Sequence, residues 1–164
     1  MTRYRRVLEA FFGFYAPVET QLKLITSFAP PLGFPLHDRA SLLQRDLLAL
    51  QLSPQEIADL PRCTDLPRID EPGYMAGCLY VLEGASLGGR IIAQALNREL
   101  GLRVDNGAAF FVGDAGQTGM RWKRVLQWLD EVANSRARGD EIVAAACGTF
   151  SALARWARLK GLSR

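Results

Sequence analysis

The stretch YVLEGASLGG, Tyr80 to Gly89, places three glycines in the middle of an apolar segment that is otherwise typical of one long helix. Each glycine inside a helix costs about 1 kcal/mol relative to alanine. Gly84 and Gly88 are four positions apart and therefore share one helix face. Three explanations account for such a face: close packing against another backbone, a kink, or a flat ligand that lies where β-carbons would collide with it.

The composition is that of an ordinary globular protein of 164 residues, which predicts one domain over 1–164. No uncharged apolar run is long enough for a membrane helix, and we expect no membrane partner. The net charge is only +3 and the arginines are dispersed, so we expect no nucleic-acid partner. Three cysteines without paired spacing, Cys63, Cys78 and Cys147, indicate reduced thiols and a cytoplasmic location. A single histidine, His37, excludes multi-histidine metal sites.

Apolar residues at helical spacing predict an all-α domain of five or six helices. The motif SPQE, Ser53 to Glu56, predicts a helix start with a capping box, and Gly101 is the expected cap after the long helix. We expect a loop over 29–35, a short extended piece over 110–112 and Asp140 as the N-cap of the last helix. The expected helices cover about 3–26, 36–50, a short segment from Ser53 toward Pro61, 71–100, 122–132 and 140–160.

The segment YVLEGASLGGRIIAQAL resembles the distal helix of heme oxygenases, and most closely that of the bacterial branch associated with bacteriophytochromes. Animal members carry Gly-Asp-Leu-Ser-Gly-Gly there, so Ala85 replaces their aspartate. Three further segments are similar to other helices of the family. They are YRRVLEAFFGFYAPVETQL for the second helix, WKRVLQWLDE for the helix facing the heme propionates, and AAACGTFSALARWARL for the final helix.

The resemblance implies a heme oxygenase-like helical fold and the oxidative opening of heme to biliverdin, CO and iron. Heme would be both substrate and cofactor, and O2 and electrons from a ferredoxin or a reductase would be consumed. A bacteriophytochrome would be a partner. The resemblance assigns the ligand face to Gly84, Gly88 and Gly89, a water-holding role to Ser86, the propionates to Lys123 and Arg124, and the pocket wall to Phe150 and Tyr80.

Each of these residues also has a structural explanation. The glycines suit close helix packing, and a buried serine commonly bonds to its own helix. Lys123 and Arg124 suit a solvated helix face, and an aromatic residue such as Phe150 at helical spacing suits an ordinary core.

The family's axial histidine precedes the helix that Thr2–Leu24 resembles, so we expect the family's first helix to be missing from this chain. His37 follows that helix, in GFPLHDR, and we predict that it lies at a turn or helix start, points to water and is not an axial ligand. No metal ligand is therefore assigned. An uncovered helix face would favour a homodimer.

Three functions remain open at this point: a heme oxygenase that supplies biliverdin to a phytochrome, a non-catalytic heme-oxygenase-like binding or interaction protein, and a thiamin-degrading type of enzyme. The third would need Cys78 or Cys147 as a nucleophile, and nothing nearby in the sequence activates either thiol.

Overall fold

The computed structural model describes residues 1–25, 32, 34–113 and 116–162 and shows an all-α fold, as predicted, with no strand among the residues it describes. The helices are α1 (Thr2–Ile25), α2 (Arg39–Ala49), α3 (Pro54–Ala58), α4 (Pro72–Leu100), α5 (Ala109–Val112), α6 (Thr118–Val132) and α7 (Arg136–Leu159). None of the described helices is both long and apolar enough to cross a membrane.

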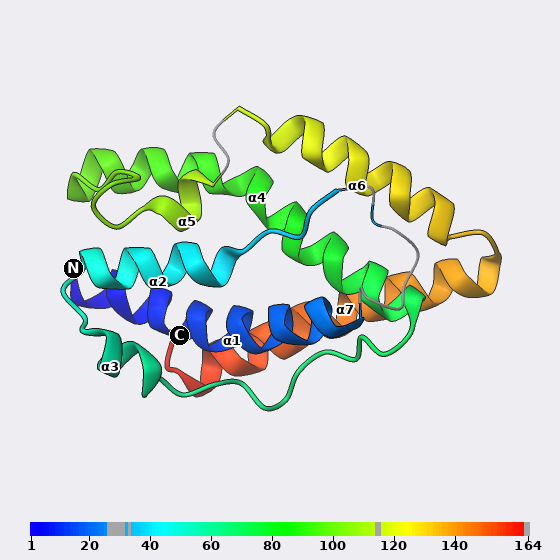
Figure 1. Cartoon of the computed structure of the whole chain (residues 1–164), viewed down its shortest axis with the longest axis horizontal. Coiled ribbons are helices and arrows are strands. Elements are labelled where there is room, and N and C mark those ends of the chain that lie inside the picture. Colours follow the sequence, from blue (N-terminus) through cyan, green and yellow to red (C-terminus); the bar gives the residue numbers. More distant parts are fainter. Residues whose placement is uncertain (26–31, 33, 114–115, 163–164) are drawn as a thin grey trace.

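The helices α4 and α7 form the main packing pair of the molecule. A β-carbon on Gly73 would touch Glu141, and one on Gly77 would lie 2.5 Å from the β-carbon of Ala145. The contacts advance along both helices together, so α4 and α7 run in the same direction. Figure 1 shows that they lie together near their N-terminal ends and separate toward their C-terminal ends. Glycine at Gly77 permits this crossing because no side chain separates the backbones.

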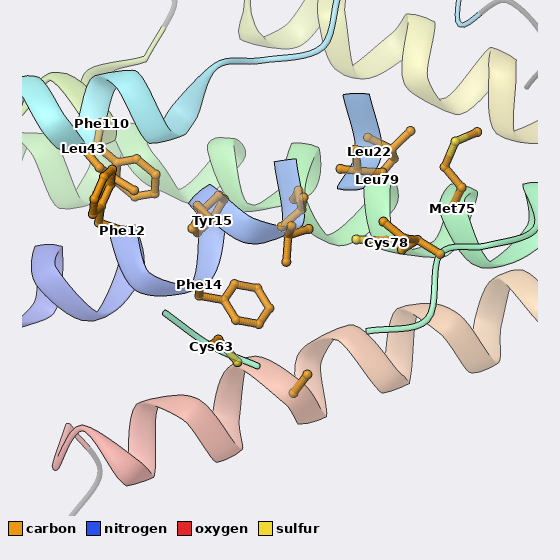
Figure 2. Packing of buried hydrophobic residues seen from close by; sticks show 14 of the residues in the cluster. Phe12, Phe14, Tyr15, Leu22, Leu43, Cys63, Met75, Cys78, Leu79 and Phe110 are labelled. Carbon is orange, nitrogen blue, oxygen red and sulfur yellow. The ribbon is translucent and has the colours of Figure 1, made fainter. Parts of the chain in front are cut away.

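The core lies between α1, α2 and α4, with α7 closing it from the side (Figure 2). Phe14 and Leu8 of α1 are fully buried, as are Met75 and Leu79 of α4. Trp156 of α7 donates its indole N–H to the carbonyl oxygen of Ala10 at 2.7 Å. This bond satisfies a buried donor and attaches the last helix to the first.

Local signals in the sequence predicted the start of α3 and the end of α4 correctly. Ser53 and Glu56 form the expected capping box, and Gly101 caps α4 with a φ of 68°. Asp38 caps α2 by accepting a hydrogen bond from the backbone N–H of Ser41. A side-chain oxygen or a glycine at a helix end satisfies groups that the helix itself leaves unpaired.

Two local predictions were wrong. The segment around Phe110 is not extended but forms α5, because Asp46 of α2 accepts the N–H groups of Ala109 and Phe110. The last helix begins at Arg136 with Ser135 as its N-cap, so Asp140 lies inside α7. The loop predicted over 29–35 falls largely outside the described residues.

Candidate functional site

The three glycines of the YVLEGASLGG segment have three different environments in α4. A β-carbon on Gly84 would lie 3.3 Å from the ring of Trp122 on α6. One on Gly89 would lie 2.6 Å from the carbonyl oxygen of Phe111 on α5. One on Gly88 would meet nothing within 4 Å. Helix packing therefore accounts for Gly84 and Gly89, and Gly88 alone opens onto free space.

Large apolar side chains are exposed on α4 and on α7. On α4, Ile91 is 73% exposed, and Leu87 and Ile92 are also exposed. On α7, Phe150 is 58% exposed, and Val143 is exposed as well. Phe150 is therefore not part of the core of the described chain. Uncovered apolar side chains of this size mark a binding or packing surface when they gather together.

Tyr80 lies at the edge of the glycine segment and packs on α6. Its ring is 5.4 Å from that of Trp122, centroid to centroid, and its side chain remains partly exposed. Trp122 thus contacts α4 at both Tyr80 and Gly84, one helical turn apart. Lys123 and Arg124, which follow Trp122 along α6, are exposed.

Ser86 forms a hydrogen bond within its own helix, which was the structural alternative to a water-holding role. Its hydroxyl donates a hydrogen bond to the carbonyl oxygen of Glu83 within the same helix. Ser86 also lines an open pocket of about 840 Å³ between α4 and the segments on either side of α5. Arg90 lines this pocket too, and each of the two residues lies roughly 160° around the helix axis from Gly88 at 100° per residue. The pocket and the open backbone at Gly88 are therefore on opposite sides of α4.

A buried carboxylate precedes the glycines, and the sequence analysis missed it. Glu83 is 3% exposed, and Arg121 of α6 donates to both of its oxygens at 2.8 Å. His37 Nδ1 lies 2.9 Å from Glu83 Oε2, and a guanidinium nitrogen of Arg39 lies 3.7 Å from the same oxygen. Burial alone would raise the pKa of Glu83, but the contacts to Arg121, His37 and Arg39 outweigh it and lower that pKa to about 2.

The prediction that His37 points to water was wrong. Its side chain is only 14% exposed, and its Nδ1 faces the Glu83 carboxylate. An ionised carboxylate can only accept a hydrogen bond, so the contact to Glu83 requires Nδ1 to carry the hydrogen, and a guanidinium nitrogen of Arg39 lies 3.2 Å from the same Nδ1. One feature of the sequence points to this contact: Glu83 stands among apolar residues of a buried helix, where a charge requires a partner. It did not indicate which cation would supply that partner.

The structure does not support a cysteine nucleophile. Cys78 is fully buried, and burial raises the pKa of its thiol to about 12, so it is a thiol at neutral pH. Cys147 is exposed on α7. In the part of the chain that the structure describes, no three His, Cys, Asp or Glu side chains come close enough together to hold a metal ion.

Comparison with known proteins identifies the family to which the chain belongs. No curated protein and no solved structure matches the chain. A family model described as heme oxygenase matches residues 1–158, which is nearly the whole sequence. The all-α fold and the glycine-rich long helix agree with that match, and the chain belongs to the heme oxygenase family.

Proposed function

We propose that this chain binds heme against the open backbone at Gly88 and opens the ring oxidatively to biliverdin, CO and iron. Membership of the heme oxygenase family supports heme as the small molecule. The observation that carries the location is the free space beside Gly88, next to the exposed side chains of Ile91 and Ile92. A macrocycle with two apolar faces needs a surface of this kind.

The residues around Gly88 fit such a ring in shape and polarity. The absent β-carbon allows close approach to the backbone, and the exposed aliphatic groups of α4 would lose contact with water against the ring. Lys123 and Arg124 would serve as cationic partners for the two propionates. When bound, heme supplies the redox-active iron at which O2 reacts. The chain's own contribution would be to hold and orient the ring and to exclude bulk water from one face.

A second candidate function is heme binding without ring opening, as in an interaction protein of the same family. The observation that favours it is the position of His37, whose imidazole is mostly buried and faces Glu83, a residue roughly 140° around α4 from Gly88 at 100° per residue. His37 is the chain's one histidine, and a neutral imidazole is the usual axial ligand in this kind of chemistry. We propose that His37 does not ligate iron.

The proposal also covers the branch of the family, the cellular location and the partners. We propose that the chain is a single domain of the bacterial, bacteriophytochrome-associated branch, and that α1 corresponds to the family's second helix. A cytoplasmic location, a ferredoxin or reductase as electron donor, a bacteriophytochrome as the acceptor of biliverdin and a homodimer complete this proposal.

The test is a hemin titration followed by addition of ascorbate. Wild type and His37→Ala should both shift the Soret band of hemin in the same way, and wild type should then produce a bilin spectrum. A shifted Soret band that ascorbate leaves intact would establish the second candidate instead. The absence of any shift would contradict both candidates. Loss of a histidine-type spectrum in His37→Ala alone would identify His37 as the axial ligand.

A further inference from the structure

The Glu83 carboxylate holds three segments that are far apart in the sequence. It accepts two hydrogen bonds from Arg121 of α6 and one from His37, which precedes α2. Arg121 also donates to the carbonyl oxygen of Pro35 at 2.6 Å. In Figure 1 the segment that leads into α2 passes between α4 and α6, where these contacts occur. One buried carboxylate therefore connects α4, α6 and the segment before α2.

The guanidinium of Arg121 is fixed on its other side as well. It lies 5.5 Å from the ring centroid of Phe34, and the Phe34 ring packs edge to face against Trp128 of α6. Arg121 is thus held by a carboxylate, a carbonyl oxygen and an aromatic ring. A guanidinium with this set of contacts has little rotational freedom, so its place in the helix fixes the rotation of the first turn of α6.

This rotation decides where Trp122 lies. Trp122 follows Arg121 directly, and it packs on Gly84 and Tyr80. Gly84 follows Glu83 directly. The ion pair and the contact between Trp122 and Gly84 are therefore adjacent along both helices. Without the ion pair, the first turn of α6 would lose one of the contacts that set its rotation, and Trp122 would be able to shift against the glycine segment.

We propose that Glu83 is a positioning residue, whose buried carboxylate holds α6 through Arg121 and thereby keeps Trp122 at the edge of the ligand face on α4. The ligand part of this inference rests on the proposed heme function, whereas the position of Trp122 does not. A buried ion pair is a poor source of net stability compared with apolar packing, and it suits a role in specifying one arrangement of two helices.

The experiment is an NMR measurement of the indole N–H signal of Trp122, in protein labelled with 15N at tryptophan. The chain has three tryptophans, so Trp122→Phe assigns its N–H signal. Glu83→Gln should shift or broaden the Trp122 signal and leave that of Trp156, which bonds to Ala10, unchanged. The matched control is Glu141→Gln, which removes the 2.8 Å pair between Glu141 and Arg138 on α7. It should leave the Trp122 signal in place.

Hemin affinity is the second measurement. Glu83→Gln should weaken hemin binding by about tenfold, and Glu141→Gln should not. If Glu83→Gln does not fold, Arg121→Lys replaces it, because lysine keeps the charge but cannot bind both carboxylate oxygens at once. A folded variant with an unchanged Trp122 signal would overturn the proposal, whatever its melting temperature. Wild type that takes up no hemin would contradict the proposed function alone, since the indole signals would still decide the role of Glu83.

Discussion

At the scale of single residues, the glycine segment divides into positions with separate roles. The sequence predicted one face from the spacing of Gly84 and Gly88, and Gly89 was expected to join it. The structure shows an aromatic ring beside Gly84, a carbonyl oxygen beside Gly89 and open space beside Gly88. A glycine inside a helix indicates that another group can lie close to the helix backbone. The residues that do so at Gly84 and Gly89 belong to other helices, so the sequence around the glycines does not identify them.

This division predicts opposite effects for two substitutions. Gly88→Leu should keep the fold and raise the free energy of unfolding by up to about 1 kcal/mol, because leucine is a better helix former at an open position. The same change should greatly weaken hemin binding, because the side chain occupies the ligand face. Thermal unfolding and a hemin titration measure the two effects.

The matched substitution is Gly89→Leu. Its β-carbon would lie 2.6 Å from Phe111 O, so it should destabilise the protein by about 1–3 kcal/mol. If Gly88→Leu is the variant that unfolds, Gly88 has a packing role and the proposed ligand face is wrong.

Glu83 predicts a dependence of stability on pH. Its pKa is about 2 in the folded protein, against 4.5 for an ordinary glutamate. A lowered folded pKa gives stability that is present above pH 4.5 and is lost as the pH falls toward 2. The full difference corresponds to about 3 kcal/mol at 1.36 kcal/mol per pKa unit. Urea unfolding of wild type and Glu83→Gln between pH 6 and 2.5 should show a shallower loss in the variant. Parallel curves for the two proteins would contradict this assignment.

At the scale of elements, long helices were predictable and the shortest one was not. The apolar periodicity of 71–100 covers α4 almost to the residue. By contrast, α5 has four residues, too few to be stable alone, and it depends on Asp46 of α2. Asp46 lies 63 positions before Ala109, so no local pattern reports the bond. The start of α7 was misplaced for a different reason, since both Ser135 and Asp140 are good N-cap residues and the local sequence does not choose between them.

Asp46→Asn should weaken the attachment of α5. Asp46 is fully buried and accepts N–H groups at 2.7 and 2.8 Å, one with each oxygen. An asparagine has one carbonyl oxygen, so one N–H would face an amide NH2 group and remain unpaired. The expected loss is about 1–3 kcal/mol of unfolding free energy, measured by chemical denaturation. Because Phe111 of α5 packs on Gly89, hemin affinity should fall as well. An unchanged midpoint would show that α5 holds its place without Asp46.

At the scale of the whole molecule, the fold class and the family followed from the sequence, and the electrostatic centre of the site did not. The family resemblance rested on the glycine helix, and the family match supports it. The Glu83 cluster joins residues 46 and 38 positions apart, His37 and Arg121, each of which looks like an ordinary surface residue in its own segment. The tertiary fold determines which distant charged groups pair. The sequence predicted the helices but not how they pack against one another, so it could not predict these pairs.

The bond between Trp156 and Ala10 has a consequence for the order in which the protein is made. The two residues are 146 positions apart, and the Trp156 ring also covers Gly13 of α1. At about 5–20 residues per second, a ribosome needs roughly 7–30 s to add the chain between them. Throughout that time the apolar side of α1 lacks the cover that α7 provides, because α1 is made before α7. An apolar helix face left uncovered in this way makes the partly synthesised chain prone to aggregation until α7 has been added.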